Sequence, residues 1–112
     1  MELNKNDIID ILKDNFNIDI IDRLNDIVNY KTYITILNTL FRDFNIWFIY
    51  QIDKNNNETA LVTTNFFINE KVFTIIIDSW FNKFVKDLDS LSEIIIKYSD
   101  IIENLNLSYK KK

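Results

Sequence analysis

The sequence has no glycine, proline, cysteine or histidine in its 112 residues. Without glycine it holds no phosphate-binding loop and no dinucleotide-binding fingerprint, because both need glycine where the backbone approaches a ligand closely. Without histidine and cysteine it lacks the commonest general base, the common transition-metal ligands and the thiol nucleophile. The absence of cysteine also excludes disulfide bonds. Carboxylates, amides, hydroxyls and aromatic rings are the groups through which the chain can act.

Coding bias explains part of these gaps. Residues with GC-rich codons are scarce as a group, since Ala60 is the only alanine and Arg23 and Arg42 are the only arginines. Residues with AT-rich codons are abundant, with 21 isoleucines, 16 asparagines and 11 lysines. This composition is typical of an AT-rich genome. Because asparagine tolerates the left-handed backbone conformation, we expect it to replace glycine in turns at 15–17, 55–57 and 69.

Length and composition predict one globular domain over residues 1–109, followed by a basic, frayed tail at 110–112. Apolar residues make up 47% of the chain and the net charge is only -4, which suits a folded core. No apolar run approaches the roughly 18 residues that a membrane-spanning helix requires. The first residues do not resemble a signal peptide. We therefore expect a cytoplasmic protein.

Two related segments near the N-terminus predict short amphipathic helices over 6–15 and 19–29. The pattern Asp-Ile-Ile-Asp-x-Leu begins at Asp7 and again at Asp19. In each copy the isoleucines and the leucine share one helix face, and aspartates line the opposite face. The shift between the copies is about 120° out of phase with a helix of 3.6 residues per turn. One continuous helix could not bury both apolar faces together, so we place a hinge at 15–17.

The middle of the chain predicts a helix followed by strands. Residues 30–44 carry the clearest helical pattern, and Asn29 can serve as its N-cap. Residues 46–52 and 59–68 are β-branched and aromatic, which is typical of strands, and 54–57 form a polar hairpin loop between them. Asn69 and Glu70 predict a second tight turn.

Residues 71–78 fit two interpretations. As a strand the segment has strong β propensity, whereas as a helix it would continue an apolar stripe toward Leu88. We favour a strand, since two strands alone would make a marginal sheet. Ser79 then begins a helix that runs to about Leu88, and a capping box at Ser90 and Glu93 opens a last helix over 91–105. The predicted fold class is α+β: N-terminal helices, a central small antiparallel sheet of about three strands, and two C-terminal helices.

The first 29 residues carry the whole net charge of the protein. They hold seven acidic and three basic side chains, whereas residues 30–112 hold ten of each. An acidic helical face suits a basic protein partner, although aspartates in helices also serve solubility and the helix dipole. We predict partner contacts through the acidic faces, an apolar anchor beside the first of them and two tryptophans: Asp7, Asp10, Asp14, Asp19, Asp22, Asp26, Ile11, Trp47 and Trp80.

Aromatic residues are more numerous than one sheet face needs. The strand at 46–52 places Phe48 and Tyr50 on one side and Trp47 and Ile49 on the other. Either helices cover both faces of the sheet, or one face is an apolar contact surface.

No catalytic, metal or cofactor site is predicted. Asp53 begins a sequence like a calcium loop, but the sixth position is Glu58 rather than glycine and the twelfth is Thr64 rather than glutamate. A hairpin turn explains that segment better. Asp78 is the one acid near a predicted strand end that suggests chemistry, and a helix cap explains it better. Arginine, the main reader of bases, occurs only twice, so direct nucleic-acid binding is disfavoured.

These features favour a non-catalytic protein-binding module that acts by surface contact. The class we expect is a small acidic inhibitor or immunity protein of a phage or mobile element, of the anti-CRISPR, anti-restriction or toxin-immunity type. Its partner would be another protein with a basic surface, without a membrane or a cofactor. The hypothesis rests on the class of protein rather than on particular residues. The alternative is a dimeric secretion or assembly chaperone or a self-associating structural protein. A homodimer is compatible with either interpretation.

Overall fold

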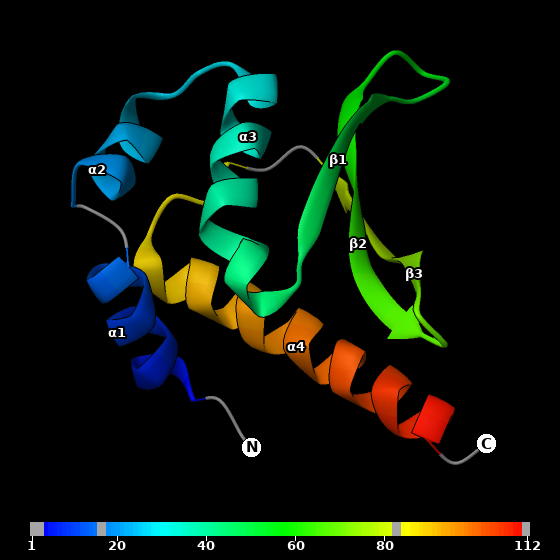
Figure 1. Ribbon diagram of the computed structural model, residues 1–112. Helices are drawn as coiled ribbons and strands as arrows, with labels where there is room; N and C mark the ends of the chain where they lie inside the picture. Colours follow the sequence, from blue (N-terminus) through cyan, green and yellow to red (C-terminus); the bar gives the residue numbers. More distant parts are fainter. Residues whose placement is uncertain (1–3, 16–17, 82–83, 111–112) are drawn as a thin grey trace.

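The computed structural model describes residues 4–15, 18–81 and 84–110 (Figure 1). Helices precede a three-stranded sheet, and one long helix follows it. The elements in chain order are α1 (Lys5–Asn15), α2 (Ile18–Asp26), α3 (Tyr30–Phe41), the 3-10 turn η1 (Arg42–Phe44), β1 (Trp47–Ile52), β2 (Glu58–Ile68), β3 (Lys71–Phe81) and α4 (Leu88–Lys110).

The sheet is an antiparallel meander in the order β1-β2-β3. β2 pairs with β1 on one side and with β3 on the other, so β1 and β3 are the edges. A β-bulge interrupts the second pairing. Val62 pairs with Asp78 while Thr63 pairs with Ile76, which leaves Ile77 as the extra residue.

The core lies between one face of the sheet and the helices. α3 and α4 cover that face, and α1 and α2 lie beyond them (Figure 1). Asn29 begins α3 as predicted, because its side-chain oxygen accepts a hydrogen bond from the Thr32 backbone N–H at 3.0 Å. The largest fully buried side chains come from the helices and from the start of the sheet: Ile8, Leu12, Leu24, Tyr30, Tyr33, Leu37, Leu40, Phe41, Ile46, Leu91, Ile95 and Tyr98.

The C-terminal region holds one long helix, so the prediction of two helices is wrong. Residues 79–81 continue β3, because they pair with 59–61 of β2 and gain cross-strand contacts there. The predicted capping box at Ser90 and Glu93 is wrong as well. The Asp87 carboxylate holds the start of α4 by accepting a hydrogen bond from the Ser90 backbone N–H at 2.8 Å. Ser90 therefore lies inside the first turn of the helix.

The remaining predicted elements are confirmed in type and place. The second helix ends at Asp26 instead of 29, and the last residues of the 30–44 helix form the turn η1. Asparagine does take the place of glycine, since Asn45, Asn56 and Asn69 have φ values of 60, 66 and 51°. Residues 16 and 17 of the predicted hinge, and 111 and 112 of the predicted tail, lie outside the described residues. No helix within the described ranges is long and apolar enough to cross a membrane.

Candidate protein-contact surfaces

Helices cover one face of the sheet, and no helix among the described residues covers the other (Figure 1), so the arrangement with helices on both faces is not the one observed. We define the outer face by the residues that alternate away from the helices: Trp47, Ile49, Gln51, Thr59, Leu61, Thr63, Asn65, Phe67, Val72, Thr74, Ile76 and Ser79. Four of its apolar side chains are exposed, by 73% at Phe67, 64% at Val72, 60% at Ile76 and 48% at Ile49. Strand pairing sets Phe67 beside Val72 and Thr63 between Trp47 and Ile76. Thr63, Asn65 and Thr74 lie among these apolar side chains, and Thr63 is itself buried. Large apolar patches left open on a protein surface mark contact sites.

The two tryptophans predicted as contact residues lie on opposite faces of the sheet. Trp47 belongs to the outer face and is half-buried. Trp80 pairs with Ala60 on the inner face and packs edge-on against Phe48, with 5.9 Å between the ring centroids. Both indole nitrogens are buried without a hydrogen-bond partner in the described part of the chain. Trp47 thus borders the exposed patch, whereas Trp80 packs against the core.

The predicted acidic faces are exposed but lie apart from the outer face. Five of the six aspartates have described side chains, and all five are exposed: Asp7, Asp10, Asp14, Asp22 and Asp26. None of the five forms an ion pair with another described residue. Asp19 lies in α2, but its side chain is outside the described residues, and Ile11 is half-buried. α1 and α2 lie on the helical side of the sheet, beyond α3 and α4 (Figure 1), whereas Trp47 belongs to the outer face, so the aspartates and Trp47 do not form one site.

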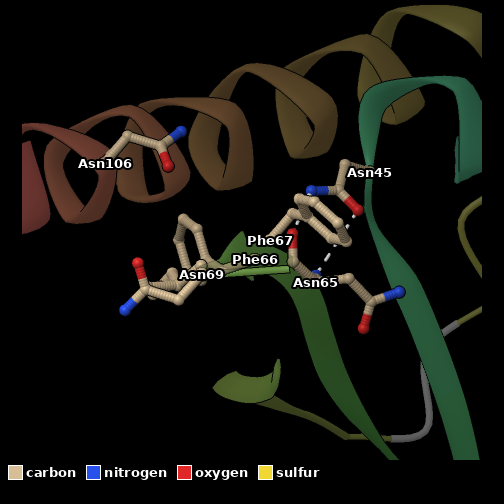
Figure 2. Close-up of a pocket in the computed structure, with 7 residues that line it drawn as sticks. Asn45, Asn65, Phe66, Phe67, Asn69 and Asn106 are labelled. Atoms are coloured by element: carbon tan, nitrogen blue, oxygen red, sulfur yellow. Dashed lines mark hydrogen bonds between the residues drawn. The ribbon is translucent and has the colours of Figure 1, made fainter. Parts of the chain in front are cut away.

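A cleft of about 410 Å³ opens between the end of β2 and the C-terminal part of α4. Figure 2 shows its side chains: Asn45, Asn65, Phe66, Phe67, Asn69 and Asn106. Asn45 donates to the Asn65 carbonyl at 2.7 Å and accepts from the Asn65 N–H at 3.4 Å. No ionisable residue lines the cleft among those described. It offers amide hydrogen bonds and ring stacking, and sequence reasoning missed it because it joins three distant segments.

The fold uses both carboxylates that the sequence suggested for chemistry. Asp53 accepts hydrogen bonds from the backbone N–H groups of Asn55 at 2.8 Å and Asn57 at 2.9 Å, which confirms the hairpin turn. Asp78 lies within β3 rather than at a helix start, so its prediction as a helix cap is wrong. It accepts a hydrogen bond from the Tyr98 hydroxyl at 2.8 Å. It also forms an ion pair with Lys97, whose nitrogen lies 3.6 Å away. Among the residues described, no three acidic side chains lie close enough together to hold a metal ion.

These contacts shift the pKa of Asp78. Burial alone would raise it, but hydrogen bonds from Tyr98 and from the Ser79 backbone, together with the charge of Lys97, lower the pKa below its ordinary value. The pKa of Tyr98 is raised, first by burial and then by its hydrogen bond to the Asp78 carboxylate. The pair therefore stays as a carboxylate and a neutral phenol at neutral pH, an arrangement that joins α4 to β3.

Comparison of the chain with protein-family models, with curated proteins and with solved structures finds no match.

Proposed function

We propose that the chain is a non-catalytic protein-binding module, of the small acidic inhibitor or immunity type, that acts by surface contact. The observation that carries the proposal is the outer face of the sheet, where Ile49, Phe67, Val72 and Ile76 are all exposed on the same side. Buried apolar and aromatic anchors supply most of the affinity at protein interfaces. A partner that covers these side chains would remove them from water.

The acidic helices contribute a different property to the same function. The exposed aspartates of α1 and α2 are unpaired within the described part of the chain, and they lie at the end of the molecule that carries the net charge. Such a field raises the association rate with a basic partner, and salt weakens it. The acidic end therefore steers, and the outer face binds. This division explains why the two surfaces need not touch.

The experiment is quantitative capture of host proteins by immobilised chain, with three matched variants. The face variant carries Ile49→Thr and Phe67→Thr, which keep β propensity and remove exposed apolar surface. The acidic variant replaces the six aspartates by asparagine. The control variant carries Val28→Ser, because Val28 is the most exposed of the large apolar residues that the structure describes and lies outside the sheet. Circular dichroism checks that all three fold.

We expect a partner that the wild type and the control retain and that the face variant loses by at least about tenfold. The acidic variant should bind more slowly at low salt and show a weaker dependence on salt, with little change in the dissociation rate. Equal capture by the face variant and the control would contradict the role of the outer face. Unchanged capture by the acidic variant at low salt would contradict the steering role of the aspartates but not the role of the outer face.

A further inference from the structure

The two edge strands of the sheet differ in whether their outward backbone groups have hydrogen-bond partners. At the β1 edge, the Asn38 side chain of α3 donates a hydrogen bond to the Phe48 carbonyl at 2.9 Å and accepts one from the Phe48 N–H at 2.6 Å. Its amide thus hydrogen-bonds as a neighbouring strand would, and it pairs the edge at Phe48, near the start of β1. Among the described residues, no strand pairs with the outer edge of β3. Within the part of the chain that the structure covers, no side chain bonds to the backbone of residues 72–77.

The β3 edge is also long and apolar. The strand has 11 residues, and Val72, Phe73 and Ile76 are among the exposed large side chains. Edge strands are usually guarded by shortness, lysine, proline, a bulge or a covering helix. β3 has a lysine only at its first residue, Lys71, and its bulge comes at Ile77. Residues 72–76 are thus an unguarded edge, which favours pairing with another strand.

We propose that this edge pairs with β3 of a second copy of the chain, antiparallel about a twofold axis at Thr74, so that two copies share one six-stranded sheet. In this register Thr74 faces Thr74 of the partner subunit, Val72 faces Ile76 of the partner subunit, and Phe73 faces Ile75 of the partner subunit. Val72, Thr74 and Ile76 share the outer face, and Phe73 and Ile75 share the inner face. Each pair therefore joins side chains of the same face.

Other registers fit less well. A shift of one residue would set outer-face side chains against inner-face ones, because side chains alternate along a strand. A shift of two would bring either Lys71 or the bulge residue Ile77 into the ladder of apolar pairs. The register about Thr74 is the one that keeps both at its ends.

Charge complementarity supports the antiparallel arrangement. β3 carries a cation, Lys71, at one end and an anion, Asp78, toward the other, both on the inner side of the strand. In this register Lys71 faces Ile77 of the partner subunit, one residue from Asp78 of the partner subunit, twice by symmetry. Parallel pairing would instead place Lys71 beside Lys71 of the partner subunit. The acidic helices α1 and α2 lie away from β3 (Figure 1), so their mutual repulsion across the dimer is screened.

The proposed dimer is closed. A twofold contact uses both β3 edges and leaves neither for further addition. A hollow of about 300 Å³, lined by Ile68, Phe73, Thr74 and Ile75, lies beside this edge, next to where Phe73 of the partner subunit would sit. The seam is short, so we expect a dissociation constant in roughly the micromolar range. This inference goes beyond the proposed function and does not rest on it.

The test is light scattering after size exclusion, over a roughly thousandfold range of concentration around the micromolar level. Thr74→Lys and Thr74→Glu should each raise the dissociation constant at least about tenfold, because like charges would meet at the axis. An equimolar mixture of the two variants should recover dimers, since lysine would face glutamate. Thr35→Lys on the exposed face of α3 adds the same charge elsewhere and should leave dimerisation unchanged.

Amide hydrogen exchange on the wild type gives a second readout that needs no variant. Protection at residues 72–76 should rise with protein concentration, and protection in β1 should not. A wild type that stays monomeric throughout, a Thr74→Lys variant that dimerises normally, a mixture that stays monomeric, or exchange independent of concentration would each overturn the proposal. The Ile49→Thr, Phe67→Thr variant should still dimerise, which separates this inference from the proposed function.

Discussion

The Asn38 side chain and the Phe48 backbone form a closed pair of hydrogen bonds, with the amide nitrogen 2.9 Å from the Phe48 carbonyl and the amide oxygen 2.6 Å from the Phe48 N–H. Both residues are partly or fully buried, so water cannot easily replace the lost partner. We expect Asn38→Ala to lower the free energy of unfolding by about 2 kcal/mol, because two backbone groups of β1 would lose their partner. Urea unfolding measures the difference.

Thr39→Ala is the matched control for this prediction. Thr39 adjoins Asn38 on α3, and its hydroxyl donates a hydrogen bond to the Thr35 carbonyl one helical turn away. Its replacement should change the stability by less than about 0.5 kcal/mol. Equal losses in the two variants would mean that the contact with Phe48 contributes nothing specific.

Acid should weaken the link between β3 and α4. The folded-state pKa of Asp78 lies below its ordinary value, so its contribution to stability is present above about pH 4 and is lost as the pH falls through the folded-state pKa. We expect Asp78→Asn and Tyr98→Phe each to be less stable than the wild type at neutral pH, and the difference to shrink below about pH 4. Unfolding curves from neutral to acid pH measure this, and a difference that stays constant down to low pH would contradict it.

Alkaline pH should reduce the stability that Tyr33 contributes. The Tyr33 hydroxyl donates to the Val85 carbonyl at 2.8 Å and accepts from the Val85 N–H at 2.9 Å, which ties α3 to the segment before α4. Burial raises the pKa of Tyr33 to about 12, although the hydrogen bond with the Val85 backbone works against this. A pKa above its ordinary value favours the folded state at low pH, and that contribution fades as the pH rises from about 10 through 12.

Tyr33→Phe separates the two roles of this hydroxyl. The variant should lose about 1–2 kcal/mol near neutral pH, since the Val85 backbone groups lose their partner. It should also depend less on pH than the wild type between about pH 10 and 12. An alkaline profile identical to that of the wild type would show that Tyr33 does not titrate with unfolding.

Local signals in the sequence predicted most of this fold. Asn29 predicted the start of α3, and Asn69 with Glu70 predicted the turn of the second hairpin, because caps and tight turns depend on a few adjacent residues. The segment from Ser79 to Phe81 was misassigned since its strand character depends on pairing with β2, about twenty residues earlier. The local sequence there fits both an amphipathic helix and a strand, and the long-range pairing with β2 selects the strand.

The candidate surfaces were predictable only in part. Alternation in β1 placed Trp47 and Ile49 on a face away from Phe48, and that face is bare. Whether helices would cover both faces was not encoded in any local pattern. Trp80 lies on the inner face because it pairs with Ala60 of β2. The bulge at Ile77 adds one residue to β3, and this shift decides which β3 side chains after Ile77 point to the outer face. Register and bulges come from tertiary pairing, so a single sequence does not reveal them.

Glu70 marks where the lack of glycine strains the fold. It has a φ of 66° in the turn between β2 and β3, next to Asn69 at 51°. Asparagine tolerates this conformation through its short polar side chain, but glutamate does not, and the left-handed region costs such a residue about 1–2 kcal/mol. We expect Glu70→Gly to raise the free energy of unfolding by about 0.5–1 kcal/mol, because the relieved strain exceeds the added flexibility of the unfolded chain. Glu70→Gln removes the charge while keeping the Cβ atom, so it should leave the stability nearly unchanged, and thermal unfolding of both variants against the wild type measures the contrast. A gain of the same size in Glu70→Gln would assign the effect to charge instead of backbone conformation.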